Sequence, residues 1–169
     1  RCPAAITLCI DGAESGTEKG ELQLTDYGIS GIAVFQLSRI AGMALQARRK
    51  VTVKIDLCPD MDLPALALFL KRKKHQYAQR DVDSYLSGLI NKKLGIYLAK
   101  KVSMSMNQPV MQIKDDTLHA FAKLLKSWEI EITGTNSYEQ AQVTAGGISF
   151  EMIDDTLESK LHKGLFFAG

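Results

Sequence analysis

The chain of 169 residues carries 21 Lys and Arg against 19 Asp and Glu, and 46% of its residues are hydrophobic. This composition is typical of a globular protein and excludes collagen-like, disulfide-rich and strongly charged disordered classes. A chain of this length buries about 68–70% of the surface of its unfolded form, so it needs no disulfide or metal ion for stability.

Cysteine spacing and hydropathy exclude two further classes. The three cysteines are widely spaced, form no C-x-x-C pair and lie far in sequence from the three histidines, so we expect reduced thiols and no metal site. No apolar run approaches the roughly 18 residues of a membrane span, and no signal peptide is visible. We therefore expect a cytoplasmic protein without a membrane partner.

The first sixty residues predict a strand-rich segment around one helix. A strand at 4–10 is followed by a loop at 11–20, which holds three glycines, and by a strictly alternating strand at 21–25. A helix with Ser30 as its N-cap runs to Gln46, because apolar residues recur every three or four positions. A strand at 51–57 ends before Pro59.

Residues 59–128 predict helices. Asp62 caps a helix with Pro64 in its first turn, and a helical stretch at 82–102 contains Gly88 and Gly95, which mark a break. After a loop at 103–112, a last helix runs from 115 to 128 with acidic residues in its first turn.

The remaining sequence predicts strands again, at 129–133, 142–144, 148–153 and 165–168. Strands at both chain ends with helices between them indicate an α+β fold, a small β-barrel-like sheet built from both ends of the chain with an inserted helical subdomain. The domain boundaries that follow are 1–58 with 129–153 for the barrel-like part, 59–128 for the helical subdomain and 154–169 for a return segment.

Charge is unevenly distributed along the chain. Residues 71–126 contain 12 Lys and Arg against 4 Asp and Glu, a net charge of +8, whereas the remainder has 9 against 15, a net charge of −6. One interpretation is a stand-alone binding module whose basic helical face docks nucleic acid or an acidic protein. The other is a solvated helical face. Aromatic residues are sparse among these lysines in sequence, so nucleic acid is not the partner we expect.

The sequence assigns no catalytic residue. No spacing along the chain links Ser30 or Cys58 to a histidine and an acid, and neither a G-x-G-x-x-G after a strand nor a P-loop is present. Three glycine-bearing segments remain, at 25–31, 142–147 and 156–169. Glycines at these positions allow close backbone approach, and the first segment opens a helix, where backbone N–H groups can meet a ligand.

Together these segments resemble a family of bacterial NAD(P)/FAD-dependent oxidoreductases that includes aminoacetone oxidases and reductases of bile-acid intermediates. The family pattern GEL-x-x-T-x-x-G-x-SG is matched from Gly20 to Gly31, VT-x-GGV from Val143 to Ile148, and T-M-ESK-x-x-x-GLYFAGE from Thr156 onward. The departures are small, with Leu157 for the methionine, Phe166 for the tyrosine and Ile148 for the valine.

The resemblance implies the insert domain of such an enzyme, covering the flavin and shaping a pocket for a small-molecule substrate. The partner would be the FAD-binding domain of the same polypeptide, which this chain lacks, so we expect FAD in the intact parent protein and none on the chain alone, which would be inactive. The chain opens in strand-like sequence and closes on an apolar run, which also predicts a piece of a longer protein. The residues expected at the edge of the cofactor or substrate pocket are Thr25, Tyr27, Gly28, Ser30, Gly31, Thr144, Gly146, Gly147, Glu158, Ser159 and Gly169.

Overall fold

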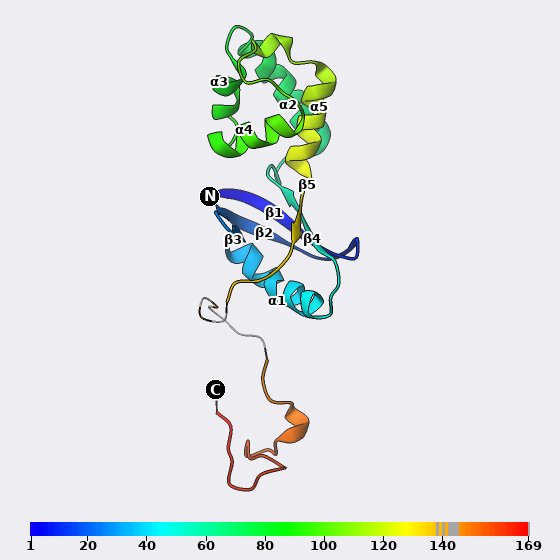
Figure 1. Cartoon of the computed structure of the whole chain (residues 1–169), viewed down its shortest axis with the longest axis vertical. Helices are drawn as coiled ribbons and strands as arrows, with labels where there is room; N and C mark the ends of the chain where they lie inside the picture. Colours follow the sequence, from blue (N-terminus) through cyan, green and yellow to red (C-terminus); the bar gives the residue numbers. More distant parts are fainter. Residues whose placement is uncertain (138, 140, 142–145, 169) are drawn as a thin grey trace. The chain divides into compact units, whose positions relative to one another are not determined.

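The structure is a computed structural model that describes residues 1–137, 139, 141 and 146–168. The chain divides into two compact units, Arg1–Thr135 and Asn136–Gly169, which are described separately below. Within the first unit, helix α1 lies against the sheet and helices α2 to α5 gather at one end of it (Figure 1). None of the helices in the described ranges has the length and hydropathy needed to span a bilayer.

The first unit is built on one antiparallel sheet of five strands in the order β3-β2-β1-β4-β5. Helices α2 to α5 are inserted between β4 and β5, so the predicted α+β fold with an inserted helical part is confirmed. The strands are β1 (Cys2–Ile10), β2 (Ala13–Thr25), β3 (Gly28–Ser30), β4 (Val51–Asp56) and β5 (Trp128–Ile132).

The prediction of a loop at 11–20 is wrong, because most of these residues belong to the long strand β2. The turn between β1 and β2 needs only Asp11 and Gly12, whose φ angles of 51° and 84° reverse the chain. The other two glycines lie inside β2, where the strand packs closely against α1. A Cβ on Gly16 would lie 3.2 Å from a methyl carbon of Leu37, and one on Gly20 would lie 3.4 Å from the Cβ of Ala33.

Helix α1 (Ile32–Gln46) covers one face of the sheet with small side chains. Its buried residues recur at helical spacing, as the apolar pattern predicted: Ala33, Leu37, Ala41 and Ala44. The predicted N-cap was wrong by one residue. Ser30 pairs with Gln23 in the β-ladder, and Gly31 occupies the cap position instead.

Three helices of the inserted part begin where the sequence predicts, after Asp62, at Val82 and at Asp115. The side chains of Asp62, Asp81 and Asn91 cap the three helices that follow them by accepting hydrogen bonds from first-turn N–H groups. Of the two glycines predicted to mark a break, Gly88 is the C-cap of α3, whereas Gly95 lies inside α4. The helices are α2 (Leu63–Gln76), α3 (Val82–Ser87), α4 (Lys92–Lys101) and α5 (Asp115–Lys126), with a 3-10 turn η1 (Val110–Gln112) before α5. Trp128, predicted as helical, begins β5.

Lys126 joins the sheet to the helical part. Its Nζ donates to the Asp56 carboxylate at the end of β4 and to the carbonyl oxygens of Cys58, at 3.0 Å, and Met61. The side chains of Lys126 and Asp56 are only 19% and 21% exposed. Because three acceptors from β4 and the following turn share one cation on α5, the orientation of the helical part against the sheet depends on this contact.

We predict that Lys126→Met lowers the free energy of unfolding by about 2–3 kcal/mol, because a half-buried carboxylate and two carbonyls lose their donor. Methionine keeps the packing of the aliphatic part of the lysine side chain. Urea denaturation followed by circular dichroism measures the change. Lys123→Met is the matched control, since Lys123 is exposed on the same helix and has no carboxylate oxygen within salt-bridge distance in the described residues. Equal loss in both variants would contradict the prediction.

The second unit contains little regular structure. The prediction of strands at 148–153 and 165–168 is wrong. A short 3-10 helix, η3 (Phe150–Met152), occupies the first range, and in the second only Phe166 forms an isolated bridge, to Glu158. The strand predicted at 142–144 lies outside the described residues.

Candidate functional site

The 25–31 turn is a tight hairpin between β2 and β3. Thr25 pairs with Gly28, and the Thr25 hydroxyl accepts a hydrogen bond from the Gly28 N–H and donates one to the Gly28 carbonyl, both at 3.1 Å. Asp26 and Tyr27 therefore form the tip, where the Tyr27 side chain is 71% exposed. The structure thus places an unpacked aromatic ring at the tip of the first predicted site segment.

Gly31 fixes how this hairpin enters α1. Its φ of 119° is a conformation that suits glycine, and a Cβ there would lie 2.1 Å from the carbonyl oxygen of Glu21 on β2. Gly31 is also the N-cap, and no side chain caps the helix and no acidic residue lies in its first turn. The first N–H groups of α1 and the positive end of its dipole are therefore available to an anionic or carbonyl oxygen.

We predict that Gly31→Ala lowers the free energy of unfolding by about 2–4 kcal/mol, because the added methyl group both strains the backbone and collides with the Glu21 carbonyl. Chemical denaturation measures it. Gly134→Ala is the control, since a Cβ at Gly134 meets nothing within 4 Å and its φ lies outside the left-handed range. A loss below about 0.5 kcal/mol in Gly31→Ala would show that the close approach carries no constraint.

The other predicted glycine segment is only partly described. Gly146 and Gly147 are exposed, and a Cβ at either would meet nothing within 4 Å. Thr144 and Gly169 lie outside the described residues. The close backbone approach expected at Gly146 and Gly147 is therefore not made to any described atom.

Residues 153–167 form a double loop held by its own polar side chains. The Asp154 carboxylate accepts from the Thr156 N–H and hydroxyl and from the Glu158 N–H, at 2.9, 2.7 and 3.0 Å. The hydroxyl hydrogen bond of Thr156 is the main cause that lowers the pKa of Asp154. The carboxylate is therefore ionised at neutral pH and organises the loop.

Glu158 and Ser159 bond mainly within this loop. One carboxylate oxygen of Glu158 accepts from the Gly164 N–H, and the Ser159 hydroxyl accepts from the N–H groups of Leu161 and His162, at 3.2 and 3.1 Å. Ser159 N–H in turn donates to the Leu165 carbonyl at 2.8 Å. In this structure both predicted site residues shape the backbone of the loop.

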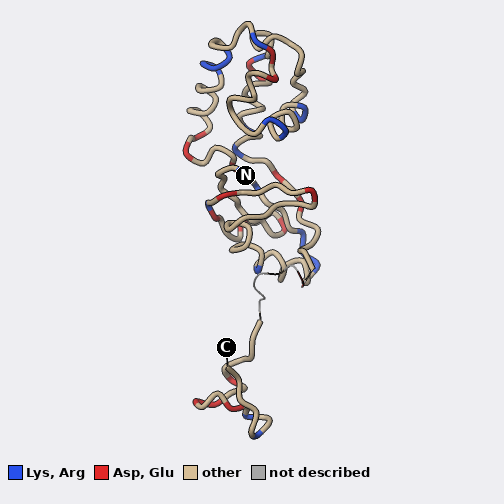
Figure 2. Tube along the Cα trace, turned by 90° about the vertical axis from the view of Figure 1, so that its left-hand side faces the viewer, with Lys and Arg blue, Asp and Glu red and all other residues tan. Residues whose placement is uncertain are grey.

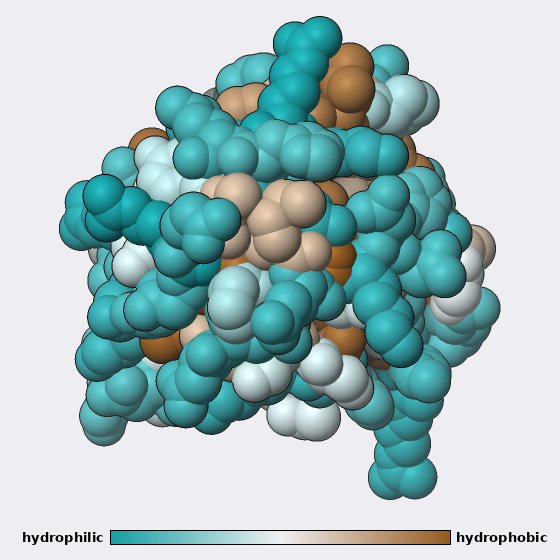
Figure 3. Space-filling model, turned by 90° about the horizontal axis from the view of Figure 1, so that it is seen from above, coloured by the Kyte–Doolittle hydropathy of each residue, from teal (hydrophilic) through white to brown (hydrophobic). Residues whose placement is uncertain are grey.

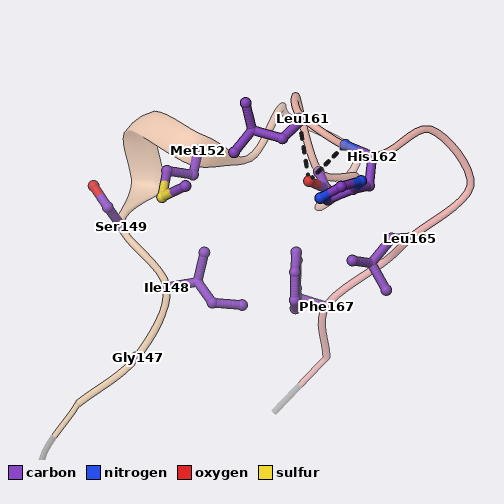
Figure 4. Close-up of a pocket in the computed structure, with 9 residues that line it drawn as sticks. Gly147, Ile148, Ser149, Met152, Leu161, His162, Leu165 and Phe167 are labelled. Carbon is purple, nitrogen blue, oxygen red and sulfur yellow. Dashed lines mark hydrogen bonds between the residues drawn. The ribbon is translucent and has the colours of Figure 1, made fainter.

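A shallow apolar pocket of about 390 Å³ lies in the second unit (Figure 4). The side chains of Ile148, Leu165 and Phe167 point toward its centre, and Met152 and Leu161 lie along its upper rim as drawn. The ring of His162 also lines the pocket (Figure 4), and the Ser159 hydroxyl accepts hydrogen bonds from the N–H groups of Leu161 and His162. The pocket suits an apolar group better than a charged one.

The second unit exposes far more apolar surface than it buries. Ile153 is its one buried hydrophobic residue among those described, whereas Phe150 is 86% exposed. Six further large hydrophobic side chains are also exposed: Ile148, Met152, Leu157, Leu161, Leu165 and Phe166. Exposed apolar surface of this density marks a contact surface.

A groove of about 420 Å³ between α2 and α5 is lined by Lys71, Asp115 and His119 among others. The carboxylate of Asp115 already forms ion pairs. Asp115 binds the Nζ of Lys74 at 2.9 Å and that of Lys71 at 3.1 Å, and Lys74, 7% exposed, also donates to the Ile113 carbonyl. The hydrogen bond from Lys74, then that from Lys71, lowers the pKa of Asp115, so this group is a structural anion and not a proton acceptor near neutral pH.

The stabilisation by Asp115 depends on pH with a defined sign. A folded-state pKa below the unfolded value of about 3.9 means that the contribution is present above that pH and is lost as the pH falls through the folded pKa. We predict that the difference in unfolding free energy between the wild type and Asp115→Asn is largest at about pH 7 and shrinks toward about pH 3. Urea denaturation at both values measures it, with the neighbouring exposed Asp116→Asn as control; a difference independent of pH would contradict the prediction.

No cysteine in the chain has the surroundings of a nucleophile. Burial is the largest influence on Cys2 and Cys58 and raises the pKa of both thiols, and Cys9 is buried. Within the described ranges, no three His, Cys, Asp or Glu side chains gather closely enough to hold a metal ion.

Sequence reasoning missed one cluster that the structure brings together on α4. Tyr97, separated from Trp128 by thirty residues in sequence, lies with its ring centroid 5.8 Å from that of Trp128. Lys101 lies over the Tyr97 ring, with its Nζ 5.5 Å from the centroid. The spacing of Lys93, Tyr97 and Lys101 by one helical turn was the signal in the sequence that could have found it.

Comparison with known proteins identifies relatives of two kinds. The chain is 31% identical over 170 residues to the 3-dehydro-bile acid delta(4,6)-reductase of Clostridium scindens, covering 100% of this chain and 42% of that protein. It is 28% identical over 169 residues to the ribosomal RNA dihydrouridine synthase of Escherichia coli, covering 99% and 38%, and 27% identical over 150 residues to that of Haemophilus influenzae, covering 88% and 35%. The chain thus spans about two fifths of the length of these relatives.

The family comparison agrees with the fold. The model of the HI0933-like protein barrel and H2TH domain matches residues 3–143, which cover the described strands and helices of the first unit except Cys2, the first residue of β1. The reductase of a bile-acid intermediate among the relatives also confirms the family resemblance read from the sequence motifs. The chain belongs to the HI0933-like barrel and H2TH domain family, a family of insert domains associated with flavoproteins.

Proposed function

We propose that this chain is the domain of a longer, NAD(P)-linked FAD-dependent oxidoreductase of the bacterial cytoplasm that lies against the isoalloxazine ring and shapes a pocket for a small-molecule substrate. The observation that carries the proposal is the 25–31 turn. It carries the first motif of the family resemblance, presents Tyr27 to solvent, and leads through Gly31 into a helix whose N-terminus no side chain caps.

The residues of the chain fit the isoalloxazine ring of FAD and do not fit its pyrophosphate. N–H groups at the start of α1 suit the carbonyl edge of a ring or an anionic substrate, whereas the sequence contains no glycine-rich loop after a strand to hold the pyrophosphate. The dinucleotide grip would therefore come from the rest of the polypeptide. When bound, FAD supplies the hydride chemistry; the role of this chain is to orient the substrate and exclude water.

The apolar surface of the second unit supports a contact with the FAD-binding domain. A segment with seven exposed large hydrophobic side chains is stable only where another surface covers them. In this proposal the hydrogen bonds of Asp154, Glu158 and Ser159 fix the loop that returns the chain to that domain.

The test uses the full-length protein with its flavin. We predict that Tyr27→Ala lowers kcat/KM about tenfold or more and changes the fluorescence of the bound flavin, while the flavin content is retained, because the ring is a positioning contact and not part of the grip. Thr17→Ala is the control, since Thr17 is exposed in the middle of β2, in the same unit but away from the 25–31 turn. If Tyr27→Ala leaves both the flavin fluorescence and kcat/KM unchanged, the proposal is wrong.

A second candidate function is reduction of a base in RNA. Two of the relatives are ribosomal RNA dihydrouridine synthases, and the helical part of this chain carries a net charge of +8 between residues 71 and 126. In Figure 2 the Lys and Arg positions are frequent along this part. A basic surface favours a polyanionic substrate over a neutral one.

A further inference from the structure

The outer face of α4 carries a cluster of lysines around an exposed ring. Lys93, Tyr97, Lys100 and Lys101 recur at spacings of three, four and seven, so they share one side of the helix. All four are exposed, Tyr97 to 47%, whereas the opposite side buries Leu94, Gly95, Leu98 and Ala99 in the core. We call these four residues with the neighbouring Trp128 the α4 face.

Among the residues that the structure describes, the lysines of the α4 face have no acidic partner. Asp83 pairs with Lys92, which lies outside the face, at 2.7 Å, and no Asp or Glu occurs between residues 84 and 114. Among the described residues, eight of the twelve Lys and Arg between 71 and 126 have no carboxylate oxygen within 4 Å, and Lys93, Lys100 and Lys101 are three of them. The face therefore presents positive charge that the protein itself leaves uncompensated.

The exposed ring of Tyr97 contacts both Trp128 and Lys101. The rings of Tyr97 and Trp128 are tilted by 57°, and Lys101 lies over Tyr97. Trp128 is half-buried against the core, so it supports the more exposed Tyr97 ring from the side. The helical end of the molecule, seen in Figure 3, is covered mostly by hydrophilic side chains. An exposed aromatic ring among lysines on a hydrophilic surface is suited to stacking on another planar group rather than to burial against an apolar partner.

We propose that the α4 face binds single-stranded RNA, with its lysines contacting successive phosphates and Tyr97 stacking on an unpaired base. The proposal rests on the second candidate function and gives it a surface. Phosphates match the uncompensated cations, and a base plane matches the supported ring, whereas an acidic peptide would use the charges and leave Tyr97 without a role. It departs from the expectation drawn from sequence, which counted few aromatics among the lysines because Trp128 is distant along the chain.

The test measures binding of a fluorescently labelled oligouridylate to the full-length protein by fluorescence anisotropy over a range of salt concentrations. The combined variant Lys93→Gln/Lys100→Gln/Lys101→Gln should weaken binding at least tenfold and reduce the slope of log K against log salt by about 2, the value for three single-strand phosphate contacts. Tyr97→Leu should weaken binding about fivefold or more, and Tyr97→Phe should restore it, because a phenyl ring still stacks.

The matched control is Arg72→Gln/Lys114→Gln/Lys123→Gln, which removes the same charge from exposed positions outside α4. Equal losses in the two triple variants, or no effect of Tyr97→Leu, would overturn the α4 face while leaving RNA binding in place. Failure of the wild type to bind any RNA would overturn the second candidate function and this inference with it. Equal affinity for the matching deoxyoligonucleotide, or displacement by polyglutamate as effective as by RNA, would overturn the choice of RNA.

Discussion

The contact between Lys126 and the end of β4 joins the sheet to the helices α2 to α5 that are inserted into it. The helical part begins after Asp56 and ends just before Trp128, so the polypeptide crosses between sheet and helices twice, at neighbouring points. Lys126, the last residue of α5, binds acceptors at the end of β4 and in the turn that follows it, and the Leu57 N–H donates a hydrogen bond to the Leu125 carbonyl at 2.8 Å. Across this junction one hydrophobic core runs continuously from β1 to α5.

Sequence patterns predicted the elements whose residues carry their own signal. The caps Asp62 and Asp81 and the break at Gly88 are local chemistry, and the helices follow them. The failures arose where a tertiary contact decided the outcome. Gly16 and Gly20 in β2 look like turn residues, yet they lie in a strand that packs closely against α1; Ser30 looks like a cap, yet a ladder partner holds it in β3. Such constraints belong to a neighbouring element and have no local pattern.

The candidate site shows the same division. The 25–31 turn was predicted from two glycines and two hydroxyls at the start of a helix, and the structure gives it a geometry in which a Cβ at Gly31 would collide with the Glu21 carbonyl. Glu158 and Ser159 were predicted from motif resemblance, and hydrogen bonding within 153–167 gives them a role that no motif describes. Tyr97 and Trp128 went unnoticed, because only the fold brings a helix surface next to the first residue of a strand. Resemblance thus identifies positions, and geometry separates those that shape a loop from those that face outward.

The order of the strands has a consequence for how this protein behaves at high concentration. Among the described strands the sheet ends in β3 on one side and β5 on the other, and the backbone groups of an unpaired edge strand can pair with another molecule. β3 has only three residues, which is too short to template a neighbour. β5 alternates half-buried Trp128, Ile130 and Ile132 with exposed Glu129 and Glu131, so an approaching copy would set like charges side by side. The acidic residues that make this part of the chain negative therefore also guard it against self-assembly into fibres.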